Sequence, residues 1–421
     1  MRFSSLTDWL AWQETLHPTT IDLGLGRVQA TLQALDWRRP ACPVVTVAGT
    51  NGKGSTVALL ASILGAAGYR VGTFTSPHLV RYNERITIAG QYASNTSLMH
   101  AFERIDAARQ GTTLTFFEFN TLAALLLFET AGLDAIVLEV GMGGRLDAVN
   151  VVDADVAVIS SIGLDHCDWL GRDLDAIGAE KAGVLRQARP AIFGARQMPD
   201  SIARIARELG SDLRRLGVDF DWQRNAGTWD WHDRDVRHNT LPLPALRGDI
   251  QLDNAASALA ALAILADRLP VSRGAIERGL TRVSLPGRFQ VIAQNGTEWI
   301  LDVAHNSDAA VTLSGRLGEL PARSPTIAVL GVLADKDWRA IAESLAGRFE
   351  GWITAGLSGP RALSPHALAE GLRAMGLHVL AECTDVATAC ARAREIAPKG
   401  RIVVFGSFLT VGPALQWLGA L

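Results

Sequence analysis

Short runs of apolar, mostly β-branched residues recur along the chain, and each is followed by a loop and then by a stretch of helical character. This alternation is typical of a parallel β-sheet whose strands are joined by crossover helices. In five of the six clearest runs, polar residues follow the apolar ones directly, at the predicted carboxyl edge of the sheet, where open α/β sheets bind ligands. The six runs are PVVTVAGT (43–50), DAIVLEVGMGG (134–144), VAVISSIGLDH (156–166), EWILDVAHN (298–306), TIAVLGVLADKD (326–337) and IVVFGSF (402–408).

The chain is long enough for two domains. At 421 residues and 45.0 kDa it exceeds the usual size of a single hydrophobic core. A helical pattern is predicted to end near Val283, and a new strand pattern begins after the segment SLPGRFQVI. We therefore place the boundary near Gly287, which gives domains at residues 1–287 and 288–421.

One segment departs from the alternating pattern. Between Arg196 and Leu246, Trp222, Trp229 and Trp231 lie among Asp, Arg and His residues. This change of composition predicts an irregular or antiparallel insertion, and no function follows from it.

Composition argues against several classes of protein. The chain is 48% hydrophobic and 20% charged, which is typical of a globular protein. Its net charge of −3 gives no broad basic surface, so a nucleic-acid partner is not expected. Asp8 and Glu14 interrupt the apolar core that a signal peptide needs. The most apolar segments are too short to span a membrane. The spacing of the four cysteines matches neither a zinc site nor a disulfide framework. We expect a cytoplasmic protein with reduced thiols and no membrane association.

The segment VAGTNGKGST (47–56) nearly matches a phosphate-binding loop. A strict Walker A motif has Ser or Thr directly after the lysine, whereas Gly54 separates Lys53 from Ser55 here. The physical requirements are nevertheless present: an apolar strand, three glycines that let backbone N–H groups approach an anion, one lysine and a predicted helix start. An ordinary glycine-rich turn is the alternative that this segment alone leaves open.

Further candidate residues lie in the segments that follow. Glu139 lies in the middle of an otherwise apolar predicted strand, where a carboxylate needs a cation or a function, and a magnesium ion near phosphates is the natural partner. Asp165 and His166 end the next strand and face the same edge. Ser76 presents a hydroxyl before a proline, and Lys181 lies in a predicted helix. For Ser76 and Lys181 a plain surface position stays open as the alternative.

Taken in order, eight motifs resemble one enzyme family. From about Ile21 to Thr410 the chain is similar to the bacterial bifunctional dihydrofolate synthase/folylpolyglutamate synthases of the Mur ligase superfamily, whose phosphate loop has the same additional residue after the lysine. The resemblance implies an α/β fold with an N-terminal P-loop-type ATPase domain of the Mur ligase kind, a smaller Rossmann-like C-terminal domain, and an active site in the cleft between them. The motifs are GTNGKGS, TSPHLVRYNERI, TFFEFNTLAALLLF, LEVGMGGRLDAVN, GLDHCDWLG, EKAGVLR, LPGRFQ and LDVAHN.

The resemblance also implies a reaction. ATP phosphorylates a carboxylate, and the amine of L-glutamate attacks the acyl phosphate to form an amide. The carboxylate belongs to dihydropteroate, which gives dihydrofolate, or to tetrahydrofolate and its polyglutamates, which extends the glutamate tail. Because the oxide of a carboxylate is a poor leaving group, the protein must supply charge neutralisation and alignment for its phosphorylation. The implied cofactors are ATP and two Mg²⁺ ions, and the implied state is a monomer.

Two other functions stay open. A Mur-type amino-acid ligase shares the phosphate loop and the acyl-phosphate chemistry, but such ligases have an additional N-terminal domain for a UDP-sugar, and about 45 residues precede the loop here. A nucleotide-binding regulator without ligation would leave the LDVAHN motif and the two-domain layout unexplained. Measuring whether phosphate release from ATP, with dihydropteroate or tetrahydrofolate present, depends on L-glutamate would distinguish these three hypotheses.

The resemblance assigns roles residue by residue at the matching positions. The residues expected to bind ATP are Thr50, Asn51, Gly52, Lys53, Gly54, Ser55, Asn254, Arg288 and Asp302. The residues expected to bind the metal are Ser55, Ser76, Glu139, His166 and Lys181, the last as a carbamylated lysine. The residues expected to act in catalysis are Lys53, His166, Lys181, Asp302 and His305. Asn254 matches a position at a helix start, so a plain N-cap is the alternative for it.

The resemblance also indicates three segments for the pterin substrate. Phe116 and Phe117 could pack against a flat pterin ring, although adjacent aromatic residues are more often part of a core. The substrate residues are Asp22, Leu23, Gly24, Thr115, Phe116, Phe117, Glu118, Arg145, Leu146, Asp147 and Ala148.

Overall fold

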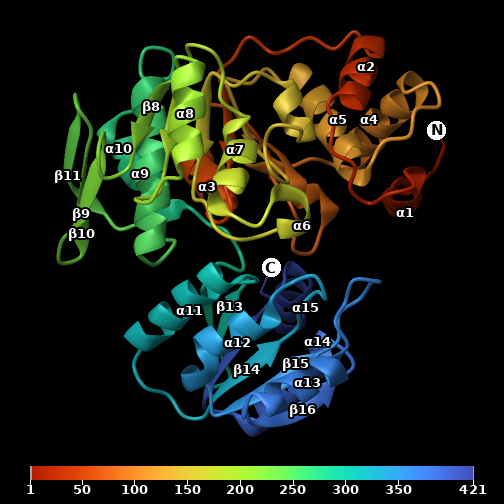
Figure 1. Ribbon diagram of the computed structural model, residues 1–421, viewed down its shortest axis with the longest axis vertical. Helices are drawn as coiled ribbons and strands as arrows, with labels where there is room; N and C mark the ends of the chain where they lie inside the picture. The colour runs from red at the N-terminus through yellow and green to blue at the C-terminus, as the bar shows by residue number, and fades with distance from the viewer. Residues whose placement is uncertain (1, 421) are drawn as a thin grey trace. The chain divides into compact units, whose positions relative to one another are not determined.

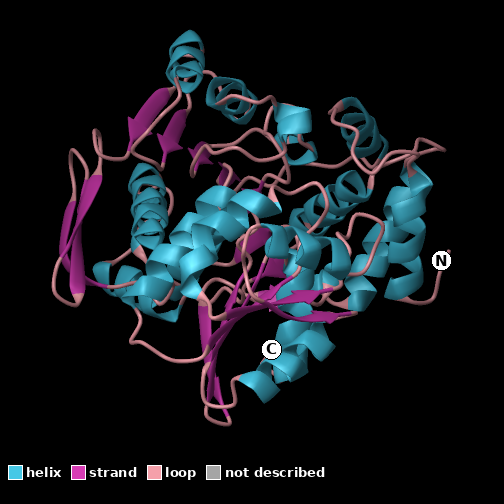
Figure 2. Cartoon of the chain, turned by 60° about the horizontal axis from the view of Figure 1, so that its bottom comes forward, coloured by secondary structure: helices cyan, strands magenta, loops and turns pink. Residues whose placement is uncertain are grey.

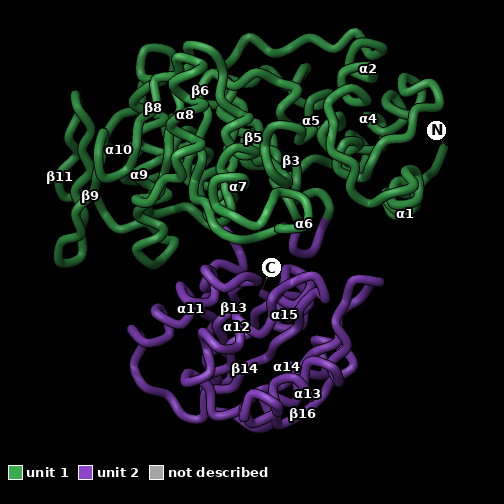
Figure 3. Tube along the Cα trace, viewed as in Figure 1, with its two compact units in different colours: residues 1–77, 82–284 green, residues 78–81, 285–421 purple. Residues whose placement is uncertain are grey.

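The computed structural model describes residues 2–420 and divides into two compact units, coloured separately in Figure 3. Unit 1 comprises Met1–Pro77 and Tyr82–Ser284, and unit 2 comprises His78–Arg81 and Leu285–Leu421. The short segment His78–Arg81 therefore packs with the later part of the chain, which no local pattern indicated. The domain limits of 1–287 and 288–421 stay a prediction.

Within the described residues, unit 1 contains an eight-stranded sheet in the order β4-β3-β2-β5-β1-β6-β7-β8. All neighbours pair in parallel except β2 with β3 and β3 with β4. The central strands are buried along their whole length, as expected for a parallel sheet covered by helices. The strands are β1 (Val44–Ala48), β2 (Val71–Phe74), β3 (Ile86–Ile88), β4 (Gln91–Tyr92), β5 (Ala135–Glu139), β6 (Val156–Ile159), β7 (Pro190–Phe193) and β8 (Asp212–Arg215).

Helices alternate with these strands along the chain (Figures 1 and 2). Helix α5 begins with a capping box, in which the Thr115 hydroxyl accepts the Glu118 N–H and the Glu118 carboxylate accepts the Thr115 N–H. The helices of unit 1 are α1 (Leu6–Leu16), α2 (Gly26–Ala34), α3 (Lys53–Ala66), η1 (Tyr82–Arg85), α4 (Asn95–Ala108), α5 (Phe116–Glu129), η2 (Ala148–Val151), α6 (Cys167–Leu170), α7 (Leu174–Ala182), α8 (Asp200–Glu208), α9 (Asp249–Ile264) and α10 (Arg273–Arg282).

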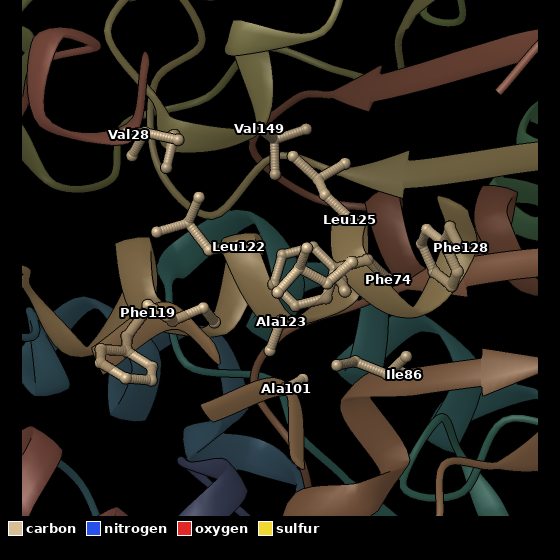
Figure 4. Close-up of a cluster of buried hydrophobic side chains, with 14 of the residues drawn as sticks. Val28, Phe74, Ile86, Ala101, Phe119, Leu122, Ala123, Leu125, Phe128 and Val149 are labelled. Carbon is tan, nitrogen blue, oxygen red and sulfur yellow. The ribbon is translucent and has the colours of Figure 1, made fainter. Parts of the chain in front are cut away.

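A hydrophobic core joins α5 to the sheet and to the N-terminal helices (Figure 4). Phe119 and Leu122 of α5 are fully buried in it, with Val28 from α2, Phe74 from β2 and Ala101 from α4. Burial of each large apolar side chain stabilises the fold by about 1.5–3 kcal/mol. This core fixes the segments on which the candidate substrate residues lie.

The tryptophan-containing insertion is an antiparallel three-stranded sheet in the order β11-β10-β9, formed by β9 (Asp221–Arg224), β10 (Thr228–His232) and β11 (Arg237–Pro242). The prediction of antiparallel structure is confirmed for these strands. It is wrong for the beginning of the segment, because α8 is regular and β8 extends the main sheet in parallel.

Unit 2 contains, among its described residues, a six-stranded sheet in the order β12-β13-β17-β14-β15-β16, parallel except for β12. Its strands are β12 (Gln290–Gln294), β13 (Thr297–Asp302), β14 (Thr326–Leu330), β15 (Gly351–Ala355), β16 (Val379–Cys383) and β17 (Arg401–Phe405). Its helices are α11 (Ser307–Glu319), α12 (Trp338–Leu345), η3 (Ala346–Arg348), α13 (Pro365–Ala374), α14 (Val386–Ile396) and α15 (Phe408–Leu418). The expected α/β architecture with a smaller Rossmann-like second part is confirmed.

Two of the expectations drawn from composition can be compared with the structure. Over residues 2–420, the helices are too short or too polar to cross a lipid bilayer. The four cysteines are free thiols, of which Cys383 and Cys390 are buried.

Candidate active site

The phosphate loop connects β1 to the first turn of α3. Gly52 precedes the helix in the left-handed region, with φ of 90°, and a Cβ there would lie 2.4 Å from Oδ1 of Asn254. Only glycine satisfies both conditions. Because α3 begins at Lys53, the N–H groups of its first turn face the loop, and Ser55 is buried within that turn. This arrangement is suited to binding a phosphate.

Two serines at the end of β6 hold the loop in place, and sequence reasoning missed them. The Oγ atoms of Ser160 and Ser161 both donate to the carbonyl oxygen of Asn51, at 2.7 and 2.9 Å. The Thr50 hydroxyl donates to the carbonyl oxygen of Gly163 and accepts the backbone N–H of Gly163. A Cβ on Gly49 would lie 2.0 Å from the Ser160 Oγ. The adjacent hydroxyls after an apolar run were the available signal.

Two lysines converge on one carbonyl oxygen of the loop. The Nζ atoms of Lys53 and Lys181 each lie 3.0 Å from the oxygen of Gly49. Lys181 is in α7, as predicted, but only 4% of it is exposed, so an ordinary surface position is excluded. Burial and the neighbouring charge of Lys53 lower the pKa of Lys181 to about 7, against the opposing effect of Asp165 and Asp147. A neutral amine is therefore accessible near neutral pH.

The loop after β5 packs against the end of α7. A Cβ on Gly144 would lie 2.9 Å from the carbonyl oxygens of Glu180 and Lys181. Asp147 is buried and accepts the Met142 and Val149 N–H groups at 2.9 and 3.0 Å. Burial raises the pKa of Asp147 to about 7, although these N–H groups and Lys53 act in the opposite direction.

The other three candidate substrate positions of this loop have different surroundings. The Arg145 side chain is exposed and its guanidinium pairs with Glu180 at 2.8 Å. Leu146 is partly buried, and Ala148 is buried at the start of η2. These two side chains are apolar, so of the four positions only Arg145 and Asp147 carry a charge that a ligand could contact.

The predicted metal residues come from five separate segments. Glu139 is buried but ends β5 rather than lying in its middle, so its carboxylate is at the carboxyl edge of the sheet. The Ser76 N–H donates to this carboxylate at 3.2 Å. His166 has a left-handed backbone at the start of α6, and its N–H donates to Asp165. The backbone of Ser76 is thus in direct contact with the Glu139 carboxylate.

The donor types at this edge are compatible with a divalent metal. Within residues 2–420, no three or more His, Cys, Asp or Glu side chains converge to form a complete metal cage. Mg²⁺ is usually held by one or two carboxylates, with water and substrate phosphates completing its shell. One buried carboxylate beside a phosphate loop fits that type of site.

Asn254 lies inside α9, not at its start. The helix begins at Asp249 after Gly248, so the N-cap alternative for Asn254 is wrong. Its side chain is buried, its Nδ2 donates to Gln251, and its Oδ1 lies 3.4 Å from the Thr56 hydroxyl of α3. The asparagine is therefore in contact with the phosphate-loop helix.

The first two groups of candidate substrate residues are joined by Arg27, which sequence reasoning passed over. Its guanidinium donates to Oδ2 and the backbone oxygen of Asp22, at 2.7 and 2.6 Å, and to both carboxylate oxygens of Glu118, at 3.0 and 3.2 Å. Leu23 and Gly24 are partly buried in the loop between Asp22 and α2.

The adjacent aromatic residues at the start of α5 are both partly buried. Phe117 packs against Gly141, where an added Cβ would lie 2.5 Å from its ring. Phe116 lies edge-on to Tyr82, and the Arg85 guanidinium is 5.5 Å from its ring centre. Both rings also pack against the hydrophobic core, so they lie at its border with charged or glycine-rich segments.

In unit 2, three predicted residues lie close together. Arg288 precedes β12, Asp302 is the last residue of β13, and His305 follows β13. Asp302 ends β13 and accepts the N–H groups of Phe289 and Ala304, at 2.8 and 2.9 Å. Burial raises the pKa of Asp302, although the nearby Arg288 acts in the opposite direction. The Nδ1 of His305 lies 2.8 Å from the Val303 carbonyl oxygen, which places a proton on that nitrogen.

Arg288 and His305 both lie over one aromatic ring of unit 2. The Arg288 guanidinium is 5.3 Å from the ring centre of Phe408, and the His305 ring is 6.2 Å from it. The structure therefore brings the three predicted residues of this unit into one neighbourhood.

Comparison with known proteins agrees with this geometry. Residues 47–240 match the Mur ligase middle domain, and residues 287–408 match the Mur ligase glutamate ligase domain. The chain is 45% identical to the dihydrofolate synthase/folylpolyglutamate synthase of Escherichia coli, over 99% of this chain and 96% of that protein. It is 30% identical to the enzyme of the same name from Mycobacterium tuberculosis, over 97% and 92%.

Solved structures show the same likeness. The structure of Escherichia coli FolC in complex with DHPP and ADP has a TM-score of 0.92 at 45% identity, covering 99% of this chain and 98% of that one. The Yersinia pestis enzyme, complexed with AMPPNP and a manganese ion, has a TM-score of 0.90 at 46% identity, with the same coverage. The chain belongs to the dihydrofolate synthase/folylpolyglutamate synthase family of Mur ligases, which are ATP-dependent ligases.

Proposed function

We propose that this protein joins L-glutamate to the carboxylate of dihydropteroate, giving dihydrofolate, and to tetrahydrofolate or its polyglutamates. The observation that carries the proposal is the 45% identity to the Escherichia coli enzyme over 99% of the chain. The position of Lys53 supports it, because its Nζ lies beside the loop and could turn from the Gly49 carbonyl oxygen to an anionic phosphate.

The reaction has two balanced steps. An oxygen of the substrate carboxylate attacks the terminal phosphorus of ATP, the bond to the bridging oxygen breaks, and ADP leaves. The amine of L-glutamate then attacks the acyl carbon, an amide bond forms, and phosphate leaves as the amine loses a proton. The protein contributes chiefly alignment and charge stabilisation.

We assign the ATP phosphates to the loop from Thr50 to Ser55. Backbone N–H groups at the start of α3 would hold them, and Lys53 would exchange its bonds to the carbonyl oxygens of Gly49 and Thr50 for bonds to the terminal phosphates. Asn254 would contact the nucleotide from α9. Its burial against Gly52 and Thr56 supports this role.

A magnesium ion, or two, would neutralise charge on the phosphates. Ser55, Ser76, Glu139 and His166 are the residues that we propose to hold it, with Glu139 as the buried carboxylate. The carboxylate is kept in place by the Ser76 N–H. Glu139→Gln should therefore abolish metal-dependent turnover while thermal unfolding stays near that of the wild type; a melted variant would point to a structural role instead.

We propose that Lys181 is carbamylated in the active enzyme. The ammonium first loses one proton, and the neutral amine then attacks carbon dioxide. A C–N bond forms and a second proton is released, which leaves a carbamate carboxylate in place of a buried cation. The lowering of its pKa to about 7 supports this, because only the neutral amine is a nucleophile. Intact-mass measurement and recovery of activity by bicarbonate after its removal would test the modification.

The residues of unit 2 would act on the same substrates. Arg288 would contact the ATP phosphates and Asp302 the nucleotide, while His305 would be directed at glutamate or the reacting carbon. The contacts of Arg288 and His305 with Phe408, and the position of Asp302 beside Arg288, support a shared task. The pterin would be held by the residues around Asp22, Phe116 and Asp147.

The decisive assay is phosphate release from ATP by the full chain, with dihydropteroate or tetrahydrofolate, in the presence and absence of L-glutamate. We expect turnover only when all three substrates are present, and the product with one added glutamate. Hydrolysis that ignores L-glutamate would overturn the proposal. We further propose a cytoplasmic monomer, which cell fractionation and sedimentation would check.

A further inference from the structure

The three-stranded sheet β9–β11 lies beside α9 (Figure 1), and two tryptophan side chains connect the sheet to this helix. Trp222 on β9 and Trp231 on β10 are paired directly across the antiparallel ladder, so both project to the same face. The Nε1 of Trp222 donates to Oδ1 of Asp253 at 2.8 Å, and the Nε1 of Trp231 donates to the carbonyl oxygen of Ala256 at 3.2 Å. The two acceptors flank Asn254 in the sequence of α9.

Asn254 is the point at which α9 meets the phosphate loop. There is no spare space between them, since a Cβ on Gly52 would lie 2.4 Å from the Asn254 Oδ1, and the Thr56 hydroxyl lies 3.4 Å from the same oxygen. A small rotation or shift of α9 along its axis would move this amide against the loop or away from it.

Apolar packing alone fixes the position of α9 weakly. The segment from Ala255 to Leu262 reads AASALAAL and is buried on every face. Its alanines give the helix a smooth surface, and hydrophobic burial is non-directional, so neither feature sets the rotation of the helix. Hydrogen bonds from neighbouring elements are directional and supply that information.

Trp222 is itself held in orientation. The Arg196 guanidinium lies 5.8 Å from the centre of the indole ring and donates to the Asp221 carboxylate at 2.7 Å. Asp221 in turn accepts the backbone N–H of Trp222 at 2.8 Å. The backbone of Trp222 is therefore tied to Asp221, and its indole ring lies against the guanidinium that Asp221 holds.

We propose that Trp222 and Trp231 are positioning residues for nucleotide binding, which hold α9 so that Asn254 stays against the phosphate loop. This inference rests on the nucleotide role proposed above for Asn254. It gives a function to the insertion, to which the amino-acid sequence alone assigned none.

The test compares two tryptophans of the same small sheet. Trp222→Phe removes the indole N–H and keeps an aromatic ring. We expect the KM for ATP to rise about 5-fold to 10-fold, the size expected for the net contribution of one ordinary hydrogen bond, with kcat within about twofold. Trp229→Phe is the matched control, because the Trp229 N–H donates to Pro242 within the sheet and not to α9. We expect this control to lower the melting temperature and to leave the KM for ATP unchanged.

Two further variants separate positioning from general damage. Asp253→Asn keeps an acceptor oxygen and should stay close to the wild type, whereas Asp253→Leu should reproduce the KM effect of Trp222→Phe. In an Asn254→Ala background, Trp222→Phe should give no further rise in KM, because its effect passes through the missing amide.

Each contrary outcome has a distinct meaning. Equal rises in KM for Trp222→Phe and Trp229→Phe, or no rise for Trp222→Phe, would overturn the positioning role alone if Asn254→Ala still raises the KM for ATP. No effect of Asn254→Ala would overturn both the positioning role and the nucleotide contact of Asn254, while the ligase reaction itself, measured by its dependence on L-glutamate, would stand.

Discussion

The two ends of the central strands in unit 1 hold buried charges in opposite ways. At the amino end, Asp155 precedes β6 and accepts the guanidiniums of Arg39, Arg189 and Arg268 at 2.6, 2.8 and 3.1 Å, with the Val44 N–H at 2.9 Å. Burial would raise the pKa of this carboxyl, but the N–H and the arginines lower it below its usual range. The folded protein therefore favours its charged form.

At the carboxyl end the charged forms are disfavoured. Lys181 and Lys53 share the carbonyl oxygen of Gly49 as an acceptor, and burial moves the pKa of Lys181 down and that of Asp147 up, each to about 7. A native fold tolerates such groups when a ligand or a reaction uses them. From this contrast we propose that the Asp155 end serves stability and the Gly49 end serves binding and catalysis, although both lie on the same strands.

The largest effect should follow from removing Lys181. Lys181→Met should lower kcat by about 10²-fold to 10³-fold, the loss typical of one preorganised charge-stabilising group. The variant should be at least as stable as the wild type, because a buried ammonium with a lowered pKa is replaced by an apolar chain. Steady-state kinetics and thermal unfolding measure the two quantities. A Lys181→Met variant that keeps its activity, or that unfolds at a lower temperature than the wild type, would contradict the assignment of the Gly49 end to function rather than stability.

The opposite result is expected at the other end. Asp155→Asn should lower the free energy of unfolding by about 2–3 kcal/mol, less than the ~3–5 typical of a fully buried pair because the arginines are about half exposed. Its kcat and KM should match those of the wild type. Urea unfolding followed by the ligase assay checks both, and a kinetic defect in the folded variant would show that this cluster also serves the reaction.

The two ends should also respond to pH in different windows. For Lys181 the folded pKa lies below the unfolded value of 10.5, so its penalty is complete below about pH 7 and is relieved as pH rises toward 10.5. The stability advantage of Lys181→Met should therefore shrink above pH 7, by at most about 1.4 kcal/mol per pH unit.

For Asp155 the folded pKa lies below 3.8, so its contribution is complete above that value and is lost as pH falls through the folded pKa. The stability difference between the wild type and Asp155→Asn should begin to shrink as the pH falls below 3.8. Urea unfolding from pH 3 to pH 10 in bicarbonate-free buffer, which keeps Lys181 unmodified, measures both windows. Parallel curves for the two variants would contradict the assignment.

The Gly49 end was largely predictable from sequence, and the Asp155 end was not. The phosphate loop, Glu139 and His166 lie in local motifs, where the order of strand, glycines and polar residues reflects a chemical requirement. Asp155 is joined to Arg39 and Arg268, which are 116 and 113 residues away. Such a cluster depends on how the strands are ordered in the sheet. The spacing of residues along the sequence therefore does not predict it.

The errors have similar causes. Asn254 was read as a possible N-cap because no change in hydrophobicity marks the true start of α9 at Asp249. Glu139 was placed inside β5, whereas the strand ends at this residue because its partners β1 and β2 turn into loops there. Arg27 was missed because its partner Glu118 lies on another helix. The first error concerns a helix boundary, whereas the other two depend on partners that tertiary packing supplies.

The smallest effect should come from removing one arginine of the Asp155 cluster. Arg189 makes its hydrogen bond to Oδ1 of Asp155 at 2.8 Å and its side chain is 45% exposed, so Arg189→Met should cost less than about 1 kcal/mol. The carboxylate keeps the guanidiniums of Arg39 and Arg268 and the Val44 N–H. Chemical unfolding in low and high salt measures the loss, which should be smaller in high salt because exposed pairs are screened. A loss as large as that of Asp155→Asn would mean that the four donors to Asp155 stabilise the fold only together. The remaining donors would then not compensate for the loss of one arginine.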